Sequence, residues 1–75
     1  MTDDELRNQL RDLEEQMAQL RRSAAEIRQR VGQGWDAPQD QADVATALTE
    51  AEEQEAFLRV LEDRRQRLLE RLGTP

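Results

Sequence analysis

Hydrophobic residues recur along the first part of the chain at alternating steps of four and three residues. This seam consists of Leu6, Leu10, Leu13, Met17, Leu20, Ala24, Ile27 and Val31. Such a heptad repeat is typical of a helix that packs against another helix in a coiled coil. Thr2 and Glu5 form a capping-box pattern at its start, and Gly32 supplies a stop signal at its end. The pattern therefore predicts a helix over residues 3–31.

A second helix is predicted over residues 40–72, after a tip over residues 32–39 that contains two glycines and a proline. Its seam also alternates steps of three and four residues, and consists of Val44, Ala47, Ala51, Gln54, Leu58, Leu61, Arg65, Leu68 and Leu72. One of its two polar members, Arg65, is expected to bury its stem. Its charged head would then reach outward to a carboxylate of the first helix, such as Asp12 or Glu14.

Charge is distributed in blocks along the two predicted helices. Residues 3–17 carry a net charge of −4 and residues 18–31 one of +3, whereas residues 40–55 carry −6 and residues 56–72 carry +2. Antiparallel pairing places each acidic block against a basic block, while parallel pairing would stack like charges. Together with the short link, this pattern predicts an all-α fold, a two-helix antiparallel coiled-coil hairpin that forms a single domain over residues 1–75.

Apolar residues beside the second seam widen the hydrophobic face beyond what one partner helix would cover. These residues are Phe57, Val60 and Leu69. Two helices alone bury little apolar area, and these side chains would otherwise face water. We therefore expect the hairpin to form a homodimer, a four-helix bundle near its leucine-rich base, with these three residues as the oligomer face.

Composition narrows the classes of function. The 75 residues include no cysteine and no histidine, which removes thiolate zinc sites, cysteine nucleophiles and the commonest general base. We therefore expect no enzymatic activity, no metal site and no cofactor.

The net charge of −6 argues against nucleic acid and against an anionic membrane surface as direct partners. No segment has the pattern of a signal peptide or a membrane span, so we expect a cytoplasmic protein.

Candidate functional residues lie around the predicted tip. No basic residue stands between Arg30 and Arg59, so Asp40 and Asp43 lie in a wholly acidic stretch. These two carboxylates fit two interpretations: helix capping, or a charged pair that meets an arginine or a cation from another molecule. Trp35 also has two interpretations, a ring folded over the start of the second helix or an exposed anchor for a partner.

Residues 40–45 form an Asp-x-x-Asp-x-Ala motif between a long heptad helix and an acidic helix. This arrangement resembles the coiled-coil region of the DksA/TraR family of bacterial RNA polymerase regulators, which carries this motif at its coiled-coil tip. The resemblance implies that Asp40, Asp43 and Ala45 are tip positions. It also implies a hairpin that enters the polymerase secondary channel and changes promoter-complex lifetime, in the family often together with guanosine tetraphosphate. The family's zinc finger has no counterpart in this cysteine-free sequence.

Two hypotheses from different classes follow. The first is a zinc-less, DksA-like transcription regulator that binds RNA polymerase through its tip, with Asp40, Asp43, Ala45 and Trp35 as the partner-binding residues. The second is a structural or adaptor coiled coil that homodimerises or holds a helix of a client protein through its wide apolar face. The first predicts that the tip matters for function, and the second predicts that the apolar face does.

Overall fold

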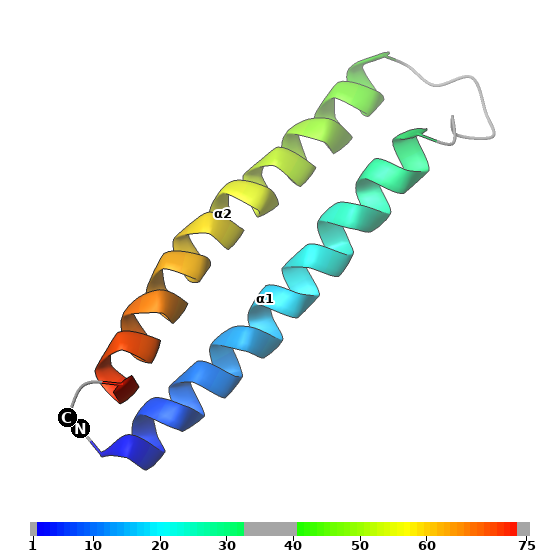
Figure 1. Cartoon of the computed structure of the whole chain (residues 1–75). Helices are drawn as coiled ribbons and strands as arrows, with labels where there is room; N and C mark the ends of the chain where they lie inside the picture. The colour runs from blue at the N-terminus through cyan, green and yellow to red at the C-terminus, as the bar shows by residue number, and fades with distance from the viewer. Residues whose placement is uncertain (1, 33–40, 74–75) are drawn as a thin grey trace.

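The computed structural model describes residues 2–32 and 41–73. In this part the chain forms two helices, α1 (Asp3–Gly32) and α2 (Gln41–Gly73). The start of α1 and the end of α2 lie together at one end of the molecule, and the two helices run antiparallel (Figure 1). The expected all-α helical hairpin is thereby confirmed. It is a slender rod, with extents of 58 × 15 × 14 Å.

The start of α1 is held by Thr2. Its hydroxyl oxygen accepts a hydrogen bond from the backbone N–H of Glu5 at 3.2 Å, and its carbonyl oxygen accepts one from the N–H of Leu6 at 3.1 Å. The side-chain bond satisfies a backbone donor that the first turn of a helix leaves unpaired. Three acidic residues also occupy the first turn of α1, where they meet the positive end of the helix dipole.

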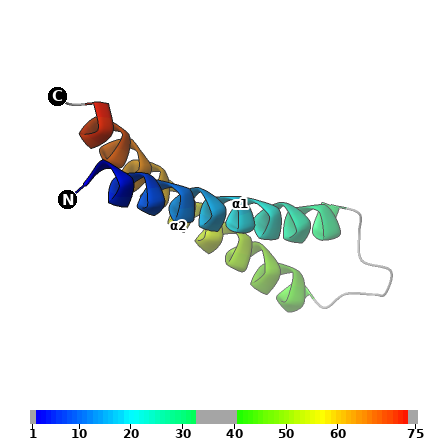
Figure 2. The same cartoon turned by 90° about the horizontal axis from the view of Figure 1, so that it is seen from below.

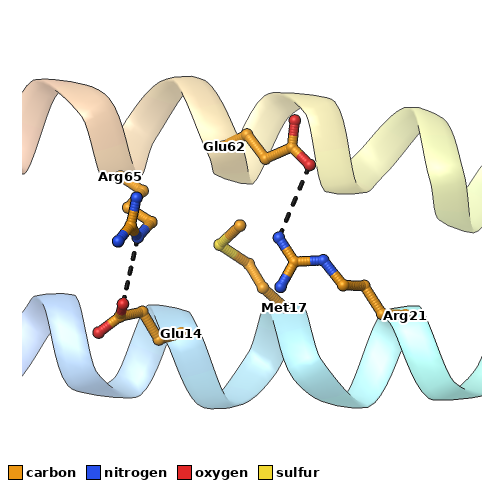
Figure 3. A pocket seen from close by; sticks show the side chains of 5 residues that line it. All are labelled: Glu14, Met17, Arg21, Glu62 and Arg65. Atoms are coloured by element: carbon orange, nitrogen blue, oxygen red, sulfur yellow. Dashed lines mark hydrogen bonds and ion pairs between the residues drawn. The ribbon is translucent and has the colours of Figure 1, made fainter.

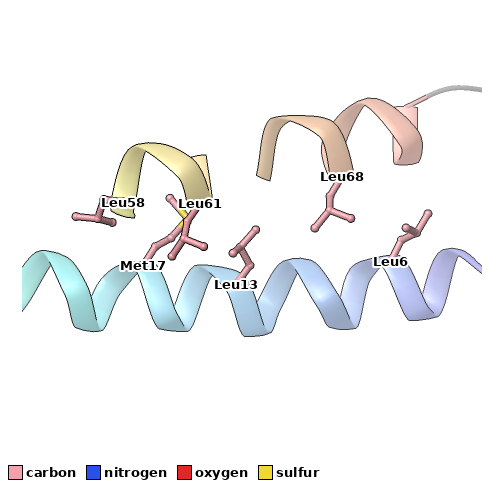
Figure 4. Close-up of a cluster of buried hydrophobic side chains, with 6 residues drawn as sticks. All are labelled: Leu6, Leu13, Met17, Leu58, Leu61 and Leu68. Atoms are coloured by element: carbon pink, nitrogen blue, oxygen red, sulfur yellow. The ribbon is translucent and has the colours of Figure 1, made fainter. Parts of the chain in front are cut away.

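The hydrophobic core lies in the half of the hairpin near the chain ends. Its buried side chains are Leu6, Leu13, Met17, Leu58, Leu61 and Leu68 (Figure 4). Met17 and Leu61 are the most deeply enclosed large side chains in the described part, with exposed fractions of 2% and 0%. Leu10, Leu20 and Leu72 pack against this cluster from its edges. Most of the apolar area that stabilises the hairpin is therefore buried in this half, here called the base.

The other half of the hairpin has a thin interface. Its buried residues are Ala24 and Ala51, at 3% and 0% exposure, and Val31 and Val44 are only partly covered. Seen from below, the helices cross instead of running strictly side by side, and α2 passes from one side of α1 to the other (Figure 2). Such a crossing is usual for seams of this spacing. Because alanine buries less area than leucine, this half contributes less hydrophobic stabilisation.

Neither helix of the described part contains a stretch long and apolar enough to cross a lipid bilayer.

Candidate interaction surfaces

One flank of the hairpin is joined by three ion pairs between the described parts of the helices. They connect Arg28 with Glu55, Arg21 with Glu62, and Arg65 with Glu14, at N–O distances of 2.6, 3.7 and 3.2 Å. The α1 members, at positions 14, 21 and 28, recur every seven residues, so they line up along one side of the helix. We call this side the paired flank.

The pair of Arg28 and Glu55 has the tightest geometry on the paired flank. Two guanidinium nitrogens of Arg28, Nε and Nη2, each donate to a different carboxylate oxygen of Glu55 at 2.6 Å. This hydrogen bonding raises the pKa of Arg28. It lowers the pKa of Glu55, against the opposing effect of desolvation. A bidentate pair of this kind attracts the two side chains and also fixes their relative position.

Arg65 confirms the expectation drawn from its place in the seam. Its Nε lies 3.2 Å from Oε2 of Glu14, and its side chain is 39% exposed. Figure 3 shows this pair on one side of Met17 and the pair of Arg21 with Glu62 on the other. These five residues line a shallow pocket. Since its charged groups already neutralise one another, the pocket offers little free charge to a ligand.

The opposite flank is different, because no ion pair joins the two helices there within the described ranges. We call it the open flank. A groove runs along it, lined by Gln16, Leu20, Glu50, Glu53, Gln54 and Phe57. Phe57 and Val60, with exposed fractions of 47% and 57%, are the exposed large hydrophobic side chains of the described chain. The open flank is therefore the more suitable one for contact with another molecule.

Gln54 places an unsatisfied polar atom beside this groove. Its side-chain oxygen is buried and has no hydrogen-bond partner among the described residues. Leaving a buried acceptor unpaired costs about 1–3 kcal/mol. Gln54 therefore weakens the seam at the junction between the leucine-rich base and the alanine-rich half.

The predicted oligomer residues do not share one surface. Phe57 and Val60 are exposed, whereas Leu69 is only half-buried. Val60 and Leu69 are nine residues apart, which places them about 180° apart around the helix at about 100° per residue. A single flat partner surface that covers Val60 would leave Leu69 on the far side of α2.

A stripe of charged and apolar residues on α2 was not predicted, because the charges were considered in blocks and not at single helical positions. Each of its members precedes a seam residue by one position: Glu50, Glu53, Phe57, Val60, Arg64 and Arg67. All six are exposed. We call this set the α2 stripe. The heptad spacing that revealed the core seam would also have revealed this stripe, had the charged residues been included.

Among the predicted tip residues, the structure describes Asp43 and Ala45, and both are exposed near the start of α2. Asp43 makes no ion pair or hydrogen bond with another described residue, although the nearby hydroxyl of Thr46 donates to the carbonyl of Ala42 at 2.8 Å. Asp40 and Trp35 lie outside the described residues. Within the described part of the chain, the Asp43 carboxylate is therefore exposed and has no ion-pair partner.

Within the described ranges, no three side chains of the metal-binding types gather closely enough to hold an ion. Comparison of the chain with protein-family models, with curated proteins and with solved structures finds no significant match.

Proposed function

We propose that this protein regulates transcription by binding bacterial RNA polymerase with the tip-side end of its hairpin, as its resemblance to DksA/TraR regulators implies. The observation that carries the proposal is the exposure of Asp43 and Ala45 near the start of α2, and this start lies at the end of the rod opposite the leucine-rich base (Figure 1). These two residues belong to the motif on which the resemblance depends. The proposed action is binding in the secondary channel, without catalysis by the hairpin itself.

The distribution of charge along the rod supports an electrostatic contact at this end. Glu55 and Glu62, further along α2, are neutralised by arginines of α1. Asp43 and Glu50, nearer the tip, form no ion pair within the described part of the chain. An arginine, lysine or metal ion of a partner could therefore approach these carboxylates without displacing an internal arginine.

The shape of the molecule also supports the proposal. A rod with two short extents of 15 and 14 Å can enter a channel that would exclude a globular domain of equal mass. Ala45 adds only a methyl group to the exposed side of α2, so it would let a partner surface approach the helix backbone closely. A bulkier residue there would hold that surface away.

The proposal is tested by binding and transcription assays with purified polymerase and the full chain. The variant Asp40→Asn/Asp43→Asn keeps side chains that cap helices nearly as well as Asp and removes two charges. We expect it to fold like wild type by circular dichroism, and to lose both polymerase binding and the effect on open-complex lifetime at a ribosomal-type promoter. Ala45→Thr, which keeps the charge, should lose the same effect through steric hindrance.

A matched control is Glu15→Gln/Glu26→Gln, which removes two charges from exposed positions of α1. It should bind and regulate like wild type. If wild type leaves open-complex lifetime unchanged, with and without guanosine tetraphosphate, the proposed function is wrong.

A second candidate function is favoured by the exposure of Phe57 and Val60. A structural or adaptor coiled coil would use this apolar surface to bind a second helix, and would not depend on the tip. In that case Phe57→Ala would abolish the interaction, while Asp40→Asn/Asp43→Asn would retain it. The two variants together therefore distinguish the two functions.

A further inference from the structure

The α2 stripe has an order of charges that makes it complementary to itself. Its acidic members, Glu50 and Glu53, lie toward the tip, and its basic members, Arg64 and Arg67, lie toward the base. The two exposed apolar side chains lie between them. We propose that a second copy of this chain docks on the open flank, with the two α2 helices antiparallel about a two-fold axis between Phe57 and Val60.

The register follows from the spacing of the stripe. An axis midway between positions 57 and 60 brings Phe57 of each copy against Val60 of the other. The same axis brings Glu53 opposite Arg64, and Glu50 opposite Arg67, and each of these contacts occurs twice. A parallel arrangement would instead place each charge against its own like charge. The order of charges therefore selects both the orientation and the register of the dimer.

The charges needed for this contact are largely free within the hairpin. Glu50, Glu53 and Arg64 form no ion pair with a described residue, although Asp12 of α1 lines a neighbouring groove with Arg64. Arg67 contacts Asp63 on its own helix at 2.6 Å, with side chains that are 74% and 61% exposed. Such an exposed pair within one helix is weak and can be exchanged for one across an interface.

The apolar centre of the stripe supplies the attraction that charge pairs alone do not. Phe57 lines the groove beside Leu20 and Gln54, so a side chain from the second copy would cover an existing hollow. Aromatic residues at the centre of an interface often contribute most of its affinity, while rim charges set orientation. The proposed contact has this arrangement. Apart from Glu50, it uses other residues than the tip-side contact, and it does not rest on the proposed polymerase function.

The test is a charge-swap series measured by sedimentation equilibrium on the full chain over a dilution series. Glu50→Arg/Glu53→Arg leaves only positive charges in the α2 stripe, and Arg64→Glu/Arg67→Glu leaves only negative ones. Each variant alone should be monomeric where wild type is dimeric. An equimolar mixture of the two should dimerise again, and so should the variant that carries all four changes. Circular dichroism confirms that every variant folds.

The matched control is Glu15→Arg/Glu26→Arg, which shifts the net charge as much as Glu50→Arg/Glu53→Arg but lies at exposed positions of α1 outside the stripe. It should dimerise like wild type. Phe57→Ala should weaken the dimer about tenfold or more. Raising the salt to about 1 M, where the Debye length falls to about 3 Å, should reduce the difference between the charge variants and wild type.

Three outcomes would overturn the proposal. Wild type could be a monomer throughout the dilution series, which would assign the open flank to a different protein or leave it unoccupied. The stripe variants could dimerise as well as wild type, which would place the interface elsewhere. The mixture could also remain monomeric, which would exclude the antiparallel register.

Discussion

Arg28 and Glu55 join the two helices through two parallel hydrogen bonds of 2.6 Å in the alanine-rich half of the hairpin. In that half the buried residues of the seam are small, so they provide little apolar area and few interlocking side chains. In this half the bidentate pair of Arg28 and Glu55 therefore fixes how the two helices are aligned, whereas in the base the packing of the large core side chains does so. It explains how a thin interface can keep a defined register.

The first prediction concerns the pH dependence of this pair. Because its hydrogen bonds with Arg28 lower the pKa of Glu55 in the folded state, the stabilisation is present above the pKa of an unfolded glutamate, about 4.3. It is lost as the pH falls through the lower folded value. Glu55→Gln should therefore lower the melting temperature relative to wild type at pH 7, and the difference should vanish in acid.

A control for this prediction uses the partner residue. In an Arg28→Gln background, Glu55→Gln should produce a much smaller pH-dependent difference in melting temperature, because the pair is already broken and only the charge of Arg59 still lowers the pKa of Glu55. Thermal unfolding followed by circular dichroism at fixed chain concentration measures both comparisons. An undiminished difference between Glu55→Gln and wild type in acid would contradict the prediction.

The second prediction concerns the centre of the core. Leu61 is fully buried, and a buried leucine replaced by alanine costs about 2–5 kcal/mol. A core of this size seldom supplies more than about 3–5 kcal/mol in total. Leu61→Ala should therefore leave most of the chain unfolded at room temperature. Circular dichroism would measure this as a loss of the helical signal. Leu61→Met, which conserves volume, should remain folded.

The third prediction concerns the unpaired oxygen of Gln54. Leucine at this position would fill the seam without a buried unsatisfied acceptor, so Gln54→Leu should stabilise the fold by about 1–3 kcal/mol. Urea unfolding at fixed chain concentration would show this as a higher midpoint. Gln19→Leu, at an exposed position of α1, is the control and should give no gain. A lower midpoint for Gln54→Leu would mean that the amide has a stabilising partner.

The fourth prediction concerns the start of α1. Thr2→Ala removes the hydroxyl that accepts the N–H of Glu5, and should cost about 1 kcal/mol. Thr2→Ser keeps a hydroxyl and should restore nearly all of that stability. Thermal unfolding of the three proteins tests this directly, and equal stability of wild type and Thr2→Ala would show that the cap contributes nothing.

The sequence by itself was sufficient to predict the helical hairpin. Heptad spacing, caps and stop signals act between residues a few positions apart, so they can be recognised without knowledge of the fold. The block distribution of charge added the antiparallel orientation. The contact of Arg65 with Glu14 was also predictable, because a long charged side chain in a seam can bury its stem and reach only the nearest carboxylates outside it.

Tertiary structure decided which flank of the hairpin is paired and which is open. Helical spacing alone places Val60 and Leu69 on opposite sides of α2, but only the contacts of Glu55 and Glu62 with α1 decide that the side of Leu69 is the paired one. It also decided that Gln54 buries an oxygen without a partner. These outcomes depend on how the two helices cross and rotate against each other, and that geometry results from the packing of all the seam residues together.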